Sequence, residues 1–522
     1  MGPLLRIQRR TRWRSLAVWV VGLIGGLAAT AASIAQLYDT PAKIKSYGDA
    51  VVSNALVAIN GRVEGIDSLG GIVQDEFGFI ASFLMPLFGI VVVASVTRRE
   101  EESGRLEALL AGRIDRRAPT LASLVLVLAA VVVTIAGFVA SLLVAGITAS
   151  GAVLYSVALG MLTLVFATLA TVCAQVVLHA RGVYILGFAV VGVSYVLRGV
   201  GDVTGTDWVW LSPLGWVEKT APFADTQRWW VLAIPFIVSF TLAAAAVLLA
   251  DRRDLGGALY RPGPGPAAAS RRLVRPVGVA AYVQRSTFAG WLVGSVALAA
   301  VMGALAEEVI HAVLGNPSLS NLVTFTSDDA ADGFLALTQV YLAIIACGYI
   351  VQALGTLRQE EADGRLEPIL AGAVSRRRWL SSQLAVVIGG LVVLVVASAV
   401  VFGAATALST GDSGYVATLL GAGLAYLPAE LVFAGIAVAV FGVAPRMYAV
   451  AWAGFGAATF IALLGHGLQM PQWLLDISPT THIGNPPLGD VDTVSLVVLT
   501  LISAALVITG FAAFRRRLIP QG

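Results

Sequence analysis

Apolar residues in this chain are gathered into twelve long runs, and short polar segments separate one run from the next. Most runs contain about 20 residues or more, which is the length a helix needs to cross the hydrocarbon core of a bilayer. They are continuous and do not alternate with polar positions, so they predict helices and not the strands of a barrel. The runs lie at about residues 16–37, 77–96, 120–148, 152–178, 182–197, 229–250, 288–310, 334–357, 380–408, 415–443, 448–468 and 493–514. We therefore expect an all-α polytopic membrane protein with about twelve transmembrane helices.

A charged segment of 20 residues occurs twice, once after the second run and once after the eighth. Island 1, residues 98–117, has the sequence R-R-E-E-E-S-G-R-L-E-A-L-L-A-G-R-I-D-R-R. Island 2, residues 358–377, has the sequence R-Q-E-E-A-D-G-R-L-E-P-I-L-A-G-A-V-S-R-R. The two islands are offset by 260 residues and share 12 of 20 positions. This repeat predicts two six-helix halves, 1–254 and 276–522, joined by a Pro- and Gly-rich linker at 255–275.

The basic residues predict which way the chain crosses the membrane. With the N-terminus placed in the cytoplasm, 28 of the 34 lysines and arginines fall on the cytoplasmic side and 6 fall outside. Cytoplasmic loops of membrane proteins carry this kind of excess of positive charge. Both termini, both islands and the linker are therefore expected to face the cytoplasm.

Composition and motifs exclude several classes of protein. Hydrophobic residues make up 58% of the chain and charged residues 12%, whereas a soluble domain usually has about 25% charged residues. The three lysines, Lys43, Lys45 and Lys219, each follow a residue other than glycine, so the G-x-x-x-x-G-K-[ST] loop that binds ATP phosphates is missing. No cysteine or histidine spacing indicates a disulfide or a metal site. We expect a protein that is not an enzyme, holds no cofactor and has no nucleic-acid partner.

Each island is expected to form a short amphipathic helix and then a turn. An acidic and a basic residue four positions apart, Glu101 with Arg105 and Glu361 with Arg365, would brace the helix. Apolar residues at i, i+3 and i+4 form a stripe in both copies, namely Leu106, Leu109, Leu110 and Leu366, Ile369, Leu370. A helix lying on the lipid surface would explain the stripe and the arginines. A protein partner that docks once per half would also explain the repeated acidic residues, so we favour docking. The apolar stripe would then enter a hydrophobic groove of the partner.

The pattern E-E-x-x-G-R-L-E-x-[LI]-L-A-G, followed by [DS]-R-R, resembles the cytoplasmic coupling segment of ABC-2 type ABC-exporter permeases. That segment lies between the second and third spans, as each island does here. Over essentially its full length, the chain is similar to the fused two-half permeases of actinobacteria that export polyketide antibiotics or tetronasin. The resemblance implies two six-helix ABC-2 repeats of the type V exporter fold, in the cell membrane of a bacterium.

The resemblance also implies the function and the partners. Two copies of a separate P-loop ATPase, which would carry ATP and magnesium, would serve one permease chain in the lipid bilayer. The permease would move hydrophobic or amphiphilic compounds, such as drugs, antibiotics or lipids, out of the cell. The matching residues of island 1 are Glu100, Glu101, Gly104, Arg105, Leu106, Glu107 and Leu110. The matching residues of island 2 are Glu360, Glu361, Gly364, Arg365, Leu366, Glu367 and Leu370.

Glu430 is the one acidic residue deep inside a predicted span. An intramembrane carboxyl group is costly and usually faces a cavity or a partner. Two interpretations are open: a hydrogen-bonded residue that fixes helix packing, and a cavity residue for a cationic substrate or a proton. The second interpretation leaves an ion-coupled secondary transporter as an alternative function, and a membrane scaffold that transports nothing is a third. Pro428 is expected to kink this span.

Overall fold

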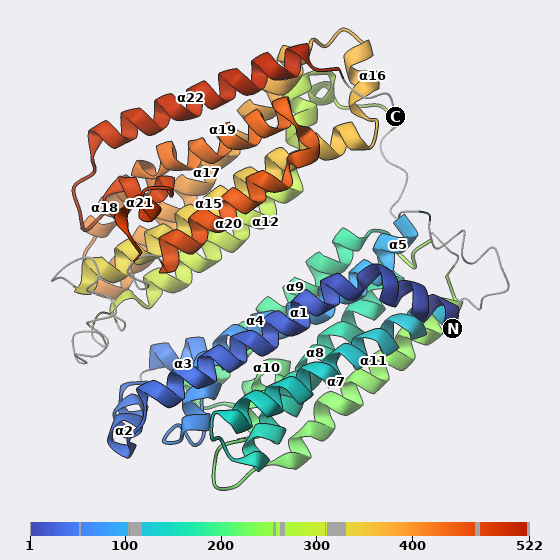
Figure 1. Ribbon diagram of the computed structural model, residues 1–522, viewed down its shortest axis with the longest axis vertical. Coiled ribbons are helices and arrows are strands. Elements are labelled where there is room, and N and C mark those ends of the chain that lie inside the picture. Colours follow the sequence, from blue (N-terminus) through green and yellow to red (C-terminus); the bar gives the residue numbers. More distant parts are fainter. Residues whose placement is uncertain are drawn as a thin grey trace. The chain divides into compact units, whose positions relative to one another are not determined.

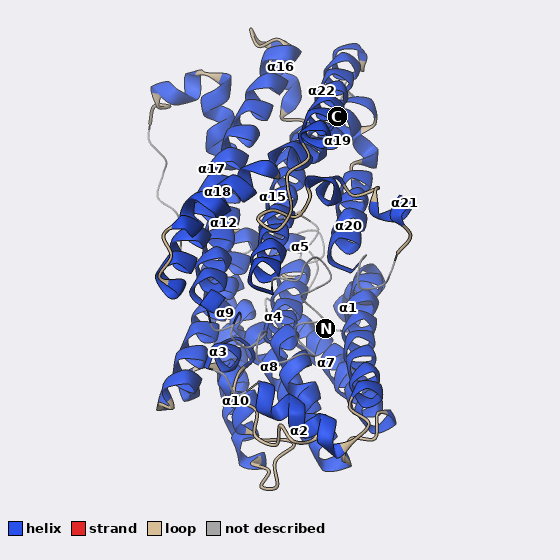
Figure 2. Ribbon diagram, turned by 90° about the vertical axis from the view of Figure 1, so that its left-hand side faces the viewer, coloured by secondary structure: helices blue, strands red, loops and turns tan. Residues whose placement is uncertain are grey.

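Most of the described residues are helical, short turns and loops connect the helices, and no strand occurs among these residues (Figure 2). The computed structural model describes residues 2–51, 54–102, 104, 117–253, 257–260, 267–307, 310, 330–464 and 470–518. Twelve helices in these ranges are long and apolar enough to cross a membrane. The predicted all-α polytopic fold and the predicted number of spans are therefore confirmed.

The chain divides into two compact units, unit 1 (Met1–Pro264) and unit 2 (Gly265–Gly522). The division lies within residues 255–275, the segment in which the linker is predicted. Each unit contains six of the twelve spans, which is the number expected of a duplicated chain.

Unit 1 is built around its fourth span, α8 (Figure 1). Its six spans are α1 (Gly2–Leu37), α4 (Leu69–Val96), α7 (Ala118–Val144), α8 (Ala149–Val176), α9 (Ala180–Thr204) and α11 (Ala233–Asp251). Helix α8 packs against α4, α7, α9 and α11. A Cβ atom at Gly89 of α4 would lie 2.7 Å from the carbonyl oxygen of Thr163 in α8. Small residues allow this close approach of helix backbones inside a membrane.

The two ends of unit 1 carry different short helices (Figure 1). Helix α5 (Arg98–Glu102) directly follows α4 at one end. At the other end lie α2 (Pro41–Ala50), α3 (Asn54–Asn60) and α10 (Pro213–Lys219). With the orientation predicted from the basic residues, α5 faces the cytoplasm and the other three face outside.

Unit 2 contains a close pair of helices, α19 and α22, that pack along one another (Figure 1). Its helices are α12 (Pro276–Ala304), α15 (Ala330–Ala362), α16 (Leu366–Ala371), α17 (Arg376–Thr410), α18 (Gly414–Ala425), α19 (Leu427–Val443), α20 (Ala449–Leu464) and α22 (Thr493–Arg516). At Gly442, an added Cβ atom would collide with the backbone oxygen of Gly510 in α22. The pair therefore depends on glycine where the two backbones meet.

The fourth span of unit 2 consists of two consecutive helices, α18 and α19, with Tyr426 between them. Pro428 lies at the start of α19, where a missing backbone N–H leaves no helical bond unmade. The interruption near this proline is consistent with the kink predicted from it. It occurs within one turn of Glu430.

Candidate functional site

Island 2 begins inside a membrane-spanning helix. Helix α15 continues through Glu360 and Glu361 to Ala362, and a turn at Gly364 separates it from α16. The short helix predicted for the island exists as α16. The acidic pair does not belong to it, however, because the backbone of α15 stays helical until the turn. Glu360 and Glu361 of island 2 therefore lie in the last turn of the second span of unit 2.

A left-handed glycine occurs at the same place in both islands. Gly104 and Gly364 both have a φ of +70°. The amide of Gly104 donates to the carbonyl oxygen of Glu101 at 2.9 Å, and that of Gly364 donates to Glu361 at 3.1 Å. Glycine adopts this conformation without the clash that a Cβ atom creates. The duplicated glycine therefore sets where the second span of each half ends.

Replacing Gly364 with alanine should destabilise the protein by about 1 kcal/mol, because a side chain disfavours positive φ. No atom lies within 4 Å of the added Cβ, so the cost comes from the backbone alone. Gly364→Asn should cost less, since asparagine tolerates this conformation better. Thermal unfolding of the purified protein measures both, with Gly421→Ala, also without neighbours within 4 Å, as the control. An unchanged midpoint for Gly364→Ala would show that the turn is not required.

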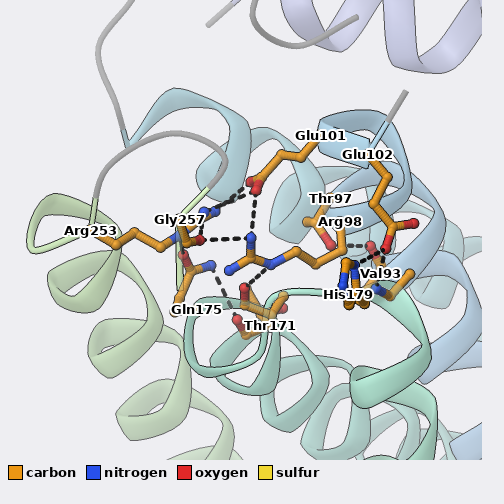
Figure 3. Close-up of polar contacts among 12 residues, drawn as sticks. Val93, Thr97, Arg98, Glu101, Glu102, Thr171, Gln175, His179, Arg253 and Gly257 are labelled. Atoms are coloured by element: carbon orange, nitrogen blue, oxygen red, sulfur yellow. Dashed lines mark hydrogen bonds and ion pairs between the residues drawn. The ribbon is translucent and has the colours of Figure 1, made fainter. Parts of the chain in front are cut away.

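In unit 1, Glu101 lies between two arginines (Figure 3). Arg98 donates to its Oε2 at 2.8 Å, and Arg253, which follows α11, donates to the same oxygen at 2.9 Å and also contacts Oε1. Only 6% of the Glu101 side chain is exposed. Bonds of this kind between charged groups are stronger than neutral ones. We call this arrangement clamp 1; it joins the end of the second span to the end of the sixth.

Arg98 is fully buried and extends clamp 1 to two further segments (Figure 3). Its Nε donates to the carbonyl oxygen of Ala174 near the end of α8, and one terminal nitrogen donates to that of Gly257 at 2.9 Å. Arg253 also donates to the side chain of Gln175 at 2.6 Å. The ends of the second, fourth and sixth spans of unit 1 therefore meet in one network of hydrogen bonds.

The glutamates beside Glu101 contact other spans. Glu100 accepts from Arg12 of α1 at 2.6 Å. Glu102 accepts from the backbone amide of Ala180 at 2.9 Å and lies 3.3 Å from the ring of His179. Ala180 is the first residue of α9, and a helix N-terminus attracts negative charge. Three consecutive glutamates thus bind three different parts of unit 1.

In unit 2, Glu361 occupies the position equivalent to Glu101 and also binds an arginine that follows the sixth span. The guanidinium of Arg517, which follows α22, donates to its two carboxylate oxygens at 2.6 and 2.7 Å. Arg376 in turn donates to the carbonyl oxygen of Arg517 at 2.6 Å. Only 6% of the Glu361 side chain is exposed. We call the pair of Glu361 and Arg517 clamp 2; like clamp 1, it joins the second span to the end of the sixth.

The arginines of the two clamps that follow the sixth spans were not predicted. Arg253 lies in the sequence D-R-R at 251–253 and Arg517 in R-R-R at 515–517. The sequence feature that could have indicated these arginines is the presence of basic residues just after the sixth apolar run of each half. The positive-inside rule already accounts for basic residues at this place, so the sequence did not indicate an ion pair with an island.

Two predictions about island 2 need correction. Glu361 does not pair with Arg365, which instead lies 3.0 Å from Glu360 and 2.7 Å from Asp363. The Gly364 turn breaks the helix between positions 361 and 365, so the geometry of an i, i+4 pair is lost. Leu366 is fully buried in the core of unit 2, and Ile369 and Leu370 pack against that core. Leu366 is therefore not available to a partner, whereas Ile369 and Leu370 are only partly covered.

The open surface of island 2 is polar. Arg365 and Asp363 are each 54% exposed, and Gly364, Glu367 and Pro368 are also exposed. We call these five residues the island 2 face. In island 1, Arg105, Leu106, Glu107 and Leu110 lie outside the described residues. Their predicted roles stay predictions.

Glu430 is 1% exposed and lines a small pocket in unit 2. Gln339, Ser398 and Tyr426 line the same pocket. Among the described residues, Oε2 of Glu430 and the hydroxyl of Tyr426 have no hydrogen-bond partner. No group of three or more His, Cys, Asp or Glu side chains that could hold a metal ion occurs among the described residues.

Comparison with known proteins gives the family. Residues 273–515 match the family model described as the C-terminal domain of the multidrug efflux system permease Rv1217c. The chain is also 34% identical over 519 residues to the multidrug efflux system permease protein Rv1217c of Mycobacterium tuberculosis. That alignment covers 98% of this chain and 94% of the relative. The twelve candidate spans of this chain fit a membrane permease. The sequence similarity extends along nearly the whole length of both proteins. The chain belongs to the family of ABC-type multidrug efflux permeases, which are multi-pass proteins of the cell membrane.

Proposed function

We propose that this permease exports hydrophobic or amphiphilic compounds with the energy of ATP hydrolysed by separate subunits, and that the two islands receive the motion of those subunits. The observation that carries the proposal is the duplicated clamp. In each unit, an acidic residue of an island binds an arginine that follows the sixth span. A force applied to an island would therefore act on two spans of its unit at once.

The island 2 face is the proposed docking surface for one ATPase. Its charges of both signs, on Asp363, Arg365 and Glu367, suit a polar contact that fixes register and partner choice. Leu366 lies directly beneath this face in the core. A force on this face would therefore be transmitted to the core of unit 2 through packed side chains. Island 1 would serve the second ATPase, which gives two ATPases per chain.

The clamps give the proposal its mechanical step. Clamp 1 holds the ends of α4, α8 and α11 together, and clamp 2 holds α15 to the end of α22. Closure of the two ATPases on ATP would move the islands, and each clamp would turn that movement into a joint shift of its spans. Rigid-body shifts of packed helices of this sort are a common way to switch a site between two states.

Reversing the charges of the island 2 face should reduce recovery of the ATPase by about tenfold. The variant is Arg365→Glu with Glu367→Arg, made in the full chain and purified by affinity tag from its native cells. Both residues are exposed, so the change should leave folding nearly intact. Mass spectrometry then measures the amount of co-purified P-loop ATPase per permease, expected at two for the wild type. The control is Asp490→Arg, an exposed charge in the loop before α22.

Equal ATPase recovery with the reversed face would contradict docking at island 2. An ion-coupled mechanism through Glu430 makes the opposite prediction for transport. Under that mechanism, efflux continues in cells that lack the ATPase and stops when the proton gradient is collapsed. Efflux that stops without the ATPase supports the proposal.

A further inference from the structure

A second short sequence occurs in both halves, in the first span and not in the islands. Residues 7–11 in α1 have the sequence I-Q-R-R-T, and residues 283–287 in α12 have the sequence V-Q-R-S-T. Helix α1 packs on α4, the second span of unit 1, and α12 packs on α15, the second span of unit 2 (Figure 1). The repeated glutamines, Gln8 and Gln284, are therefore candidates for a contact that both units share.

In unit 1, Gln8 binds the end of the second span. Its side-chain amide nitrogen donates to the carbonyl oxygen of Val96 at 3.3 Å. Val96 is the last residue of α4 and lies two positions before island 1. Carbonyl groups at the end of a helix have no partner further along that helix, so a side chain from a neighbouring helix can bind them. Gln8 is only 7% exposed. It thus joins the start of the first span to the end of the second.

In unit 2, Gln284 binds the second span at the equivalent place. Its amide nitrogen donates to the hydroxyl oxygen of Thr356 and to the carbonyl oxygen of Ala353, both at 2.8 Å. Thr356 lies two positions before island 2, as Val96 does before island 1. Gln284 is 1% exposed. The same side chain of the first span therefore contacts the second span at the same distance from the island in both units.

Stability alone does not explain why glutamine stands at both positions. The side-chain oxygen of each residue, Oε1 of Gln8 and Oε1 of Gln284, has no hydrogen-bond partner among the described residues. A buried polar atom without a partner costs free energy of the same order as a hydrogen bond contributes. An apolar side chain of similar length would avoid this cost. What the two glutamines have in common is their place beside an island.

We propose that Gln8 and Gln284 are positioning residues for transport. Each holds the first span of its unit to the second span at the end next to the island, so that the two spans move together. The clamps already join the second span to the end of the sixth. Movement of an island would then shift three spans of its unit as one body. Assigning the cause of this movement to an ATPase rests on the proposed function; the joint movement of the spans does not.

The two contacts differ in how much other residues support them. Four positions after Gln8, Arg12 donates to the carbonyl oxygen of Ser95 at 3.1 Å and to Glu100 at 2.6 Å. Four positions after Gln284 stands Phe288, an apolar residue that packs against the core of unit 2. Gln8 therefore shares its task with an arginine, whereas the residue at the same place in unit 2 cannot form such bonds. A change at Gln284 should have the larger effect.

Efflux of a fluorescent drug from cells that express the full chain tests the proposal. Gln284→Met keeps the length of the side chain and removes the donor, and it should lower the rate of efflux by about fivefold. Gln8→Met should lower the rate by about twofold. The amount of chain in the membrane and its thermal unfolding midpoint should stay close to wild type, because the unpaired oxygen is removed as well. Efflux that falls only in proportion to the amount of protein would overturn the proposal.

Gln352→Met is the matched variant. Oε1 of Gln352 accepts from the indole nitrogen of Trp291 at 2.9 Å, so this bond also joins α15 to α12. The corresponding residues of unit 1 are Ser15 and Val92, and a valine cannot form such a bond. Efflux by Gln352→Met should remain near the wild-type rate. An equal loss of efflux in Gln352→Met and Gln284→Met would mean that any hydrogen bond between these helices has the same effect, and the proposal would be wrong.

A covalent bridge tests the joint movement directly. The variant is Gln284→Cys with Thr356→Cys, in a chain whose native Cys173 and Cys347 are changed to alanine, and dibromobimane is the short cross-linker. Without the cross-linker, efflux should be as low as that of Gln284→Met. The bridge should restore most of the efflux, since it holds the same two spans together. If the bridge instead abolished the remaining efflux, the spans would have to separate during transport, which contradicts the proposal.

These measurements are independent of the energy source, because efflux and its recovery by the bridge report only on the spans. A failure of the proposed function would appear elsewhere, as unchanged ATPase recovery with the reversed island 2 face. Unchanged efflux by both Gln8→Met and Gln284→Met, with normal ATPase recovery by the wild type, would refute the positioning role alone.

Discussion

Replacing Arg517 with glutamate is expected to abolish drug efflux. The substitution sets two carboxylates against one another where the guanidinium now binds both oxygens of Glu361 at 2.6 and 2.7 Å. Breaking a largely buried ion pair by changing one partner costs about 3 kcal/mol or more. The end of α22 would separate from the end of α15, so motion of island 2 would no longer reach the sixth span. Efflux of a fluorescent drug from cells measures the loss.

Two further variants separate this effect from a general loss of charge. Arg516→Glu changes an exposed neighbour in the same basic run and should leave efflux near the wild-type level. The double variant Glu361→Arg with Arg517→Glu restores opposite charges at the same two positions and should recover part of the efflux. Recovery of ATPase with the purified Arg517→Glu chain should be unchanged, because the island 2 face is untouched. Normal efflux by Arg517→Glu would refute a role of clamp 2 in transport.

Replacing Gly442 with leucine is the second change with a large expected effect. Helices α19 and α22 approach so closely that even a Cβ atom at Gly442 would collide with the backbone oxygen of Gly510. Gly510 has a similarly close approach to the carbonyl oxygen of Val438. A whole leucine side chain would force the helices apart, at a cost of about 3 kcal/mol or more. We expect most of the chain to be lost from the membrane fraction and efflux to disappear.

Gly421→Leu is the matched control for this substitution. Gly421 lies in α18 of the same unit, is exposed, and has no atom within 4 Å of an added Cβ. Its replacement should leave the amount of protein and the efflux close to wild type. The measurement is the amount of monodisperse protein extracted from equal quantities of membrane. If Gly442→Leu were extracted as well as Gly421→Leu, the close packing of α19 on α22 would be unnecessary for the fold.

The spans were predictable from the sequence because a bilayer imposes a simple requirement on length and polarity. Twelve continuous apolar runs satisfy that requirement, and the repeated islands indicated two halves. The residues at which the helices end were harder to predict from the sequence. Helix α15 continues as far as Ala362, five residues beyond its apolar run, since charged residues at a helix end can remain helical in water.

The clamps were not predictable in the same way. The acidic residue of clamp 2 is separated from its arginine by 156 residues, and the packing of α19 against both α15 and α22 brings them together. Local spacing favoured Arg365 as the partner of Glu361. The sequence did contain a warning against that pair, since Gly364 stands between them and ends the helix.

The two clamps are unequal, and the difference has an evolutionary consequence. Glu101 is held by two arginines and linked to α8, whereas Glu361 is held by Arg517 alone among the contacts described for it. In a transporter assembled from two identical chains, one gene specifies both halves, so such a difference cannot be inherited. Joining the halves in a single chain removes that constraint. The half with the more extensive clamp can then become rigid, while the other half changes conformation more readily when its island moves.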